Sequence, residues 1–334
     1  MRRSCLLAPA SLAAVAAVSA LALAWASGAP GGGREVLFTV QEGWGAARIA
    51  GALSDSGLVR SRLYILVRAR MLGLSTMFQA GTYRFDSSME PDSIISLMAQ
   101  GAVVPEPTHW VTVPEGLRIE ETLPLLAQNL DIPLDSLEEA ASDDSLLSSL
   151  GLASLEGFLF PETYEFADSL PARSILARMV RTGLERRDST WLGSVEGLGL
   201  TGQSAVVLAS IVEREARIDT ERPMVAGVFL NRLRAGMRLE SCATVQYALG
   251  AVRERLTYAD LRIDSPYNTY LHAGLPPGPI CSPGQPSLAS VANPDTSGGY
   301  MYFVSREDGS GGHLFARTLA GHYANIREVR SGQH

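Results

Sequence analysis

The sequence predicts an α+β protein in which a small α+β module precedes a larger mixed α/β domain, with one transmembrane helix at the N-terminus. Three observations lead to this fold class. An uncharged apolar run opens the chain, two strand-turn-helix patterns follow it, and aromatic, proline and glycine residues alternate with helical patterns in the second half. The predicted boundaries are 1–34 for the anchor and a glycine-rich linker, 35–105 for the module, 106–154 for a connecting strand-helix unit with an acidic insertion, and 155–330 for the larger domain.

The N-terminal run has the features of a membrane-targeting segment. Arg2 and Arg3 precede an uncharged apolar stretch over residues 5–26. A spanning helix needs about 20 apolar residues, and arginines before it hold the N-terminus in the cytoplasm. We therefore expect a single-pass anchor with the rest of the chain outside the cytoplasm. A cleaved signal peptide is the alternative, because Ala24-Trp25-Ala26 fits the small-x-small pattern of cleavage sites.

Strands and helices alternate through the first half of the chain. The expected elements are a strand at 36–40, helices at 46–53 and 60–72, a strand at 81–85 and a helix at 91–100. The pattern restarts with a strand and turn over 111–116 and a helix at 119–129, which makes a weak internal repeat. Residues 131–152 are acidic and rich in serine, and we interpret them as a surface insertion.

The overall composition indicates a globular protein and argues against a nucleic-acid partner. With 46% hydrophobic and 19% charged residues, the 334-residue chain has the composition of a globular protein. Its formal net charge is −7 and it contains no lysine. An acidic protein is repelled by polyanions, so we expect no nucleic-acid partner.

Two cysteines, Cys242 and Cys281, lie in the part of the chain predicted to be exported. An oxidising compartment would let them form a disulfide, and two unpaired, buried cysteines are the alternative. The sequence has no Cys-x-x-Cys spacing, so it predicts neither a zinc site nor a redox motif. We expect no cofactor.

The most informative helix is predicted over residues 204–215, with Thr201 as its N-cap. At 100° per residue Glu215 shares a face with three apolar side chains, Leu208, Ile211 and Val212, whereas Glu213 points away and is expected to be exposed. Apolar surroundings disfavour the charged form of a carboxyl group, which is the property that a general acid needs at neutral pH. Alternatively, Glu215 ends the helix in solvent or pairs with a neighbouring arginine.

The residues that follow favour a sugar-binding cleft. Residues 264–287 contain too much proline and glycine for a regular element, and long irregular loops inside compact domains are usually functional. Tyrosine rings stack on sugar faces, and amides and hydroxyls bond to sugar substituents. A rigid loop of purely structural purpose is the alternative. A metal role for His313 has little support, because no helix carries two histidines at ligand spacing.

Several segments together resemble the successive motifs of the MltG/YceG-like endolytic transglycosylases. They occur in the family's order, at 156–164, 209–215, 228–233, 265–284 and 311–313. The resemblance implies that the small module is LysM-like and that the catalytic glutamate, the second acid of a Glu-x-Glu pair, is Glu215. One departure is Ser241-Cys242-Ala243-Thr244, where the family commonly has Ser-Asp-Pro-Thr. Another is Glu240, where glutamine is usual.

By this resemblance the protein would cut the β-1,4 bond between N-acetylmuramic acid and N-acetylglucosamine in nascent peptidoglycan strands. The cut would leave 1,6-anhydro ends and limit strand elongation. The expected place is the bacterial cytoplasmic membrane, with the catalytic domain on the periplasmic side, and peptidoglycan synthases are candidate partners. The side chains expected to contact substrate are Thr244, Tyr247, Tyr267, Asn268, His313 and Glu162.

Two other functions compete with this interpretation. A hydrolytic muramidase would need a second acid, for which Glu162, Glu240 and Asp264 are candidates. A non-catalytic scaffold would bind the cell wall through the module and need no acid at all.

Overall fold

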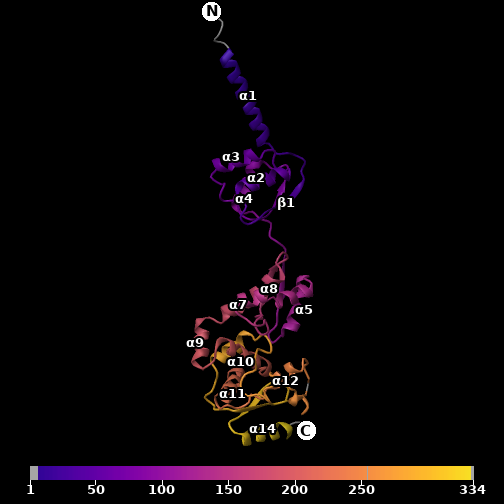
Figure 1. The fold of residues 1–334 in the computed structure, drawn as a ribbon, viewed down its shortest axis with the longest axis vertical. Coiled ribbons are helices and arrows are strands. Elements are labelled where there is room, and N and C mark those ends of the chain that lie inside the picture. The colour runs from indigo at the N-terminus through magenta and orange to yellow at the C-terminus, as the bar shows by residue number, and fades with distance from the viewer. Residues whose placement is uncertain (1–6, 254, 332–334) are drawn as a thin grey trace, which may run out of the picture. The chain divides into compact units, whose positions relative to one another are not determined.

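The computed structural model describes residues 7–253 and 255–331, with side chains of the first helix described from Val15 onward. The chain forms two compact units, residues 1–107 and 108–334 (Figure 1). In the described residues, the first unit combines helices with one two-stranded antiparallel sheet, and the second combines helices with two such sheets. This mixture confirms the predicted α+β class. Arg2 and Arg3, which the membrane prediction used, lie outside the described residues.

The apolar N-terminal segment forms a helix, α1 (Leu7–Ser27). Its fully described part, Val15–Ser27, is apolar but shorter than a membrane span, and no other single helix in the described ranges passes a test of length and hydropathy. One bent pair passes it jointly, namely α9 (Ser189–Gly197) with α10 (Gly202–Glu215), which meet at 84°. Residues 205–212 of α10 are buried inside the second unit, so this pair belongs to a protein core.

The first unit has the predicted β-α-α-β-α order after α1. Its elements are β1 (Glu35–Val40), α2 (Ala46–Asp55), α3 (Arg62–Met71), β2 (Gly81–Asp86) and α4 (Pro91–Gln100). The two strands pair antiparallel, with Phe38 opposite Tyr83. Alternate side chains of each strand point into the core, where the rings of Tyr83 and Phe85 stack 5.5 Å apart. The buried Tyr83 hydroxyl donates to the Gln79 carbonyl at 2.7 Å, so no polar group is stranded there.

The second unit begins before the predicted domain boundary. Its strand β3 (Thr108–Thr112) pairs antiparallel with β4 (Thr163–Ala167), and both belong to one core with the helices that lie between them. Those helices are α5 (Ile119–Leu130), α6 (Leu134–Ala141) and α7 (Asp144–Leu150). The structure therefore joins residues 108–154 to the segment that follows, because β3 and β4 form one two-stranded sheet.

Helices dominate the remainder of the second unit. They are α8 (Ala172–Arg186), α9, α10, α11 (Arg222–Arg234), α12 (Cys242–Ala248), α13 (Gln285–Ala292) and α14 (Leu319–Ser331), with 3-10 turns at Asp219–Glu221 and Asp260–Arg262. Helix α10 packs against α9, α11, α12 and α13. The hairpin of β5 (Tyr302–Ser305) and β6 (His313–Ala316) lies against α14, with Ser305 opposite His313.

The predicted N-cap of α10 is confirmed. The Thr201 hydroxyl accepts a hydrogen bond from the Ser204 amide at 3.1 Å, and the Ser204 hydroxyl accepts one from the Thr201 amide at 2.8 Å. This reciprocal pair satisfies two groups that a helix start leaves without partners. The cap defines where α10 begins, and the helix ends at Glu215.

Close packing around α11 can be tested at a glycine. A Cβ added at Gly227 would overlap the main-chain carbonyl oxygen of Asp295, whereas one at Gly193 in α9 meets nothing within 4 Å. We expect Gly227→Ala to lower the free energy of unfolding by about 2 kcal/mol, since a backbone group cannot rotate away. The matched change Gly193→Ala should raise it by about 0.5 to 1 kcal/mol through helix propensity. Denaturant unfolding measures both, and stabilisation by Gly227→Ala would contradict the packing.

Candidate active site

Glu215 is the last residue of α10, and its carboxyl group leaves the buried helix at a polar hollow. Its Oε1 accepts a hydrogen bond from the Ser241 hydroxyl and another, of 3.3 Å, from the Ala243 amide. Both donors belong to the start of α12. No group within residues 7–253 and 255–331 bonds to Oε2. One oxygen of the carboxyl group is therefore oriented by the protein while the other is available to a ligand.

Two hollows, of about 390 and 510 Å³, meet at this carboxyl group. They share four wall residues, namely Glu215, Cys242, Ser305 and His313. The first is completed by Arg232, Leu239, Glu240, Tyr270, Phe303, Val304, His322 and Ile326, and the second by Arg214, Arg217, Arg255, Glu307 and Gly311. A cleft of this size with convergent polar groups is typical of a small-molecule or sugar site.

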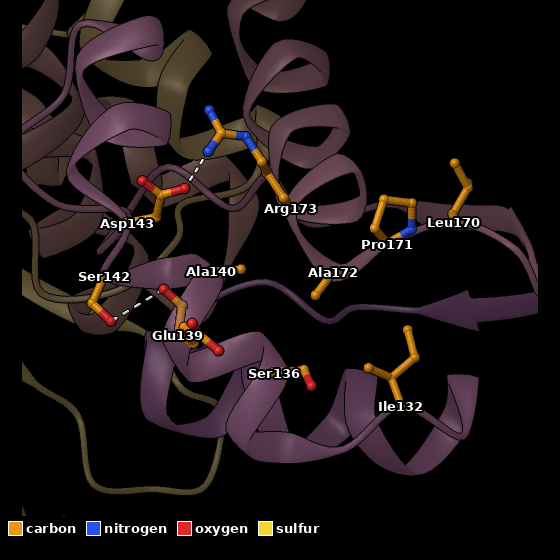
Figure 2. Close-up of a pocket in the computed structure, with 10 residues that line it drawn as sticks. All are labelled: Ile132, Ser136, Glu139, Ala140, Ser142, Asp143, Leu170, Pro171, Ala172 and Arg173. Carbon is orange, nitrogen blue, oxygen red and sulfur yellow. Dashed lines mark hydrogen bonds and ion pairs between the residues drawn. The ribbon is translucent and has the colours of Figure 1, made fainter.

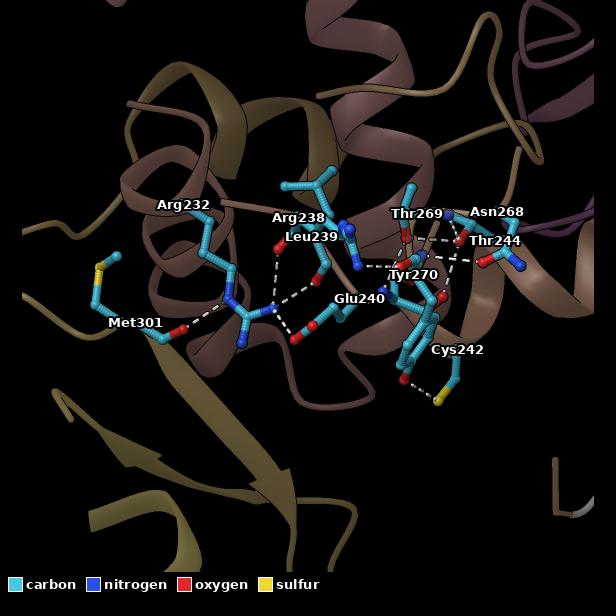
Figure 3. Close-up of polar contacts among 11 residues, drawn as sticks. Arg232, Arg238, Leu239, Glu240, Cys242, Thr244, Asn268, Thr269, Tyr270 and Met301 are labelled. Atoms are coloured by element: carbon cyan, nitrogen blue, oxygen red, sulfur yellow. Dashed lines mark hydrogen bonds and ion pairs between the residues drawn. The ribbon is translucent and has the colours of Figure 1, made fainter. Parts of the chain in front are cut away.

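A buried arginine shapes the turn that carries the Glu215 donors (Figure 3). The Nε of Arg232 donates to the Met301 carbonyl at 2.7 Å, and its Nη1 donates to the Leu239 carbonyl at 2.8 Å. The same nitrogen lies 3.3 Å from Glu240 Oε2. Glu240 has φ +50°, a left-handed conformation that non-glycine residues rarely adopt. Arg232 thus stabilises a strained turn directly before Ser241.

Tyr270 forms another part of the wall. Its hydroxyl lies 3.2 Å from Cys242 Sγ, and its amide donates to the Asn268 side chain at 2.9 Å (Figure 3). Burial raises the pKa of Tyr270 far above its ordinary value, with a smaller contribution from Cys242. The phenol therefore stays protonated at neutral pH and can serve as a donor.

His313 is held by an acid that the sequence did not point to. Glu221, at the end of the 3-10 turn before α11, accepts from the His313 amide at 3.2 Å and lies 2.7 Å from its Nδ1. Both side chains are largely buried. A hydrogen bond from Nδ1–H to the carboxylate fixes the imidazole ring and leaves Nε2 on the side away from Glu221. The two residues are 92 positions apart, and no local pattern signals the pair.

The other residues predicted to contact substrate lie elsewhere. Thr244 and Asn268 are fully buried, and Asn268 bonds to the carbonyls of Leu261 and Ile263. Neither Tyr247 nor Tyr267 lines the two hollows at Glu215, and their rings meet each other at 4.7 Å. Glu162 forms an ion pair of 2.8 Å with Arg186, also outside those walls. Of the six predicted contacts, the structure brings His313 alone to Glu215.

The expectation that Glu213 is exposed was wrong. Its side chain is 6% exposed and pairs with the equally buried Arg222 at 3.1 Å. Its second oxygen accepts the Gly284 amide at 2.9 Å. The helical-face argument assumed a solvent side, but α10 has core on every side and the loop before α13 covers Glu213. This acid has a structural role.

The disulfide left open by the sequence is not formed. Cys242 and Cys281 are both free thiols. Cys242 lies beside Tyr270 in the cleft wall, whereas Cys281 is buried against α10 and donates to the Ser210 carbonyl at 3.3 Å. Burial raises the pKa of the Cys281 thiol well above its ordinary value. In the described ranges, no group of three or more His, Cys, Asp or Glu side chains is placed to hold a metal.

Another hollow of the second unit, of about 760 Å³, lies between α6 and α8 (Figure 2). Its notable polar contact is the ion pair of Arg173 with Asp143. It contains no residue of the Glu215 cleft. Size alone therefore does not identify the functional site, whereas the oriented carboxyl group does.

The fold and the site together define a two-unit α+β protein with a helix-terminal glutamate in a polar cleft. The chain belongs to the YceG-like family, whose model matches residues 38–328. This confirms the family resemblance recognised from the sequence motifs.

Named relatives agree with this membership. The endolytic murein transglycosylase of Bacillus subtilis is 29% identical over 306 residues, covering 86% of this chain and 82% of the relative. That of Streptococcus pneumoniae is 28% identical over 320 residues, covering 86% of this chain and 57% of the longer relative. The crystal structure of a YceG-like protein from Listeria monocytogenes has a TM-score of 0.59 and 27% identity, covering 88% of this chain and 99% of that one.

A buried acid beside Tyr247, outside the two hollows at Glu215, gives a prediction on pH. Glu156 accepts the Ile119 amide at 3.2 Å and lies 3.5 Å from the Tyr247 hydroxyl. Burial raises its pKa from 4.5 to about 7, against the lowering effect of backbone hydrogen bonds. The folded state therefore holds this proton more tightly than the unfolded chain. Its stabilising contribution is complete below pH 4.5 and is lost as the pH rises through about 7.

The loss corresponds to about 3 kcal/mol between pH 4.5 and pH 7 and above. We expect Glu156→Gln to remove most of this decline, which guanidinium unfolding at a series of pH values measures. Glu138→Gln, on the exposed side of α6, serves as the control and should leave the pH profile unchanged. An identical decline in Glu156→Gln would contradict the assignment.

Proposed function

We propose that this protein is an endolytic peptidoglycan lytic transglycosylase with Glu215 as its acid and base. The observation that carries the assignment is the carboxyl group of Glu215, with one oxygen held by Ser241 and Ala243 and the other available in the cleft. The names of the two bacterial relatives support the same activity.

In the reaction Glu215 first donates its proton to the oxygen that links N-acetylmuramic acid C1 to N-acetylglucosamine C4. The C1–O bond breaks, and positive charge develops at C1 as in other glycosidic cleavages. The carboxylate then removes the proton of the muramyl C6 hydroxyl while O6 bonds to C1. The products are a free C4 hydroxyl and a 1,6-anhydro ring, and the acid is restored without water.

The cleft residues have distinct tasks in this proposal. Ser241 is a positioning residue, because its hydroxyl orients the Glu215 carboxyl group. His313 and Tyr270 contact the sugar, since both line the wall beside that group. Thr244 and Asn268 act indirectly, by holding the segment that includes Thr269 and Tyr270. No such task follows for Tyr247, Tyr267 or Glu162.

A hydrolytic muramidase is the second candidate, and one observation bears on it. Glu240 lines the same hollow as Glu215, whereas Glu162 and Asp264 do not. Its carboxylate is engaged by Arg232, which would have to release it before it could activate water. Products with anhydro ends support the transglycosylase, and products with an added water support the muramidase.

We also propose that α1 belongs to a single-pass anchor in the cytoplasmic membrane, with the rest of both units on the outer side of that membrane. Its apolar residues 15–27 and the preceding apolar sequence support this placement. The first unit is LysM-like in the proposal and binds glycan, and peptidoglycan synthases are the partners that would supply nascent strands. A scaffold without catalysis is excluded if the purified chain digests murein.

The catalytic assignment is tested by Glu215→Gln, which keeps the shape but removes the acid. We expect the rate of murein digestion to fall by about 10²-fold or more, because loss of a general acid has effects of this size. Mass spectrometry of the released fragments measures both rate and product. Glu240→Gln is the control and should retain anhydro products. Undiminished digestion by Glu215→Gln would remove the assignment.

The role of Ser241 gives a separate prediction. Ser241→Ala should lower kcat about tenfold with little change in KM, because a misoriented acid affects the transition state more than binding. Ser241→Thr, which keeps a hydroxyl group, should recover most of the rate. Thermal unfolding of all three proteins controls for folding. A change confined to KM would show that Ser241 binds substrate and does not position Glu215.

A further inference from the structure

The first unit carries an apolar groove of about 770 Å³ between α1 and α3. Its walls are residues 19–27 at the end of α1 and the side of α3 that bears Leu63, Val67 and Met71. These three side chains are 66%, 51% and 72% exposed, and they recur every four residues on one helix face. Soluble surfaces rarely leave large apolar side chains aligned in this way. The groove therefore fits an apolar ligand.

The positive charge of the segment that contains α3 indicates that the apolar ligand also carries an anionic group. Residues 56–85 contain five arginines and no acidic residue, although the whole chain is acidic. Arg68 is paired with Asp92 at 2.7 Å. Arg62 and Arg70, exposed on α3, have no acidic partner among the described side chains. An apolar helix face bordered by arginines is typical of helices that lie in the interface of an anionic membrane.

The contact between α1 and α3 indicates how deep the apolar face of α3 would lie in a membrane that α1 enters. Arg60, two residues before α3, donates to the Trp25 carbonyl at 3.3 Å, and its guanidinium carbon lies 5.8 Å from the centroid of the Trp25 ring. Tryptophan concentrates at the boundary between headgroups and acyl chains. The groove runs along α1 from Trp25 back to Ser19, about 9 Å at the rise of an α-helix. Interfacial helices bury their apolar faces to about this depth.

We propose that the groove between α1 and α3 binds an anionic phospholipid of the outer leaflet. Acyl chains pack on Leu63, Val67 and Met71, and three arginines outside the groove walls, Arg60, Arg62 and Arg70, bind headgroup phosphates of the same leaflet. The proposal rests on the anchoring role given to α1 above. Its consequence is that the first unit lies on the membrane surface through α3, in addition to being tethered by α1.

The test uses a photoreactive residue in the full chain. Val67→p-benzoylphenylalanine, inside the groove, is compared with Leu37→p-benzoylphenylalanine on β1, where the native side chain is 61% exposed but lines no part of the groove. Each protein is reconstituted in vesicles of phosphatidylglycerol and phosphatidylethanolamine, irradiated and digested. Mass spectrometry counts the phospholipid adducts on the labelled peptide. We expect about fivefold more adducts, or a larger excess, at position 67, because an interfacial face contacts lipid directly.

Two further arms separate the possible outcomes. Arg62→Glu combined with Arg70→Glu should lower the yield at position 67 in anionic vesicles and leave it unchanged in phosphatidylcholine. Equal yields at positions 67 and 37, or cross-linking of position 67 to a second copy of the chain, would overturn the groove as a lipid site.

Flotation of the same vesicles reports the anchor independently. Protein that floats without preferential labelling overturns the groove and leaves the anchor intact. Protein that does not float overturns both. Murein digestion by the same samples tests the catalytic proposal, which stands or falls separately from these results.

Discussion

Enclosure of α10 is the constraint on which the rest of the second unit depends. Its residues 205–212 are buried by neighbouring helices, so the helix can end only where polar groups are provided for its last side chains. Glu213 meets Arg222 and the Gly284 amide, and Glu215 meets Ser241 and Ala243. The packing that buries α10 therefore places the Glu213 carboxyl group in a structural ion pair and the Glu215 carboxyl group at the cleft.

The cleft is built from buried polar contacts between distant segments. Arg232 joins α11 to the turn before α12 and to the strand hairpin, and Glu221 joins the start of α11 to His313. Each buried charge costs desolvation energy unless it is paired and hydrogen-bonded, and these groups are. Such networks position side chains accurately. The proposed reaction requires this accuracy, because its single acid must first donate and then accept a proton.

The two units have different surface chemistry. Segment 56–85 of the first unit is basic, and its α3 face is apolar. The second unit presents a polar cleft of hydroxyl, imidazole and arginine groups around the Glu215 carboxyl group. Lipid contact and glycan cleavage call for these two kinds of surface respectively. The proposed membrane-tethered transglycosylase would need both.

Local pattern alone determined the β-α-α-β-α order of the first unit, the Thr201 cap and the helix that ends at Glu215, because hydrophobic period and capping residues act over a few positions. The family motifs likewise predict Glu215 as the catalytic acid. Tertiary structure alone decided that Glu213 is buried, that Cys242 and Cys281 stay apart, and that Ser241 and Glu221 hold the cleft residues Glu215 and His313. Three of the contacts behind these outcomes join residues that are 26, 71 and 92 positions apart. Periodicity shows that a helix face is apolar, but not which distant groups will cover its other faces.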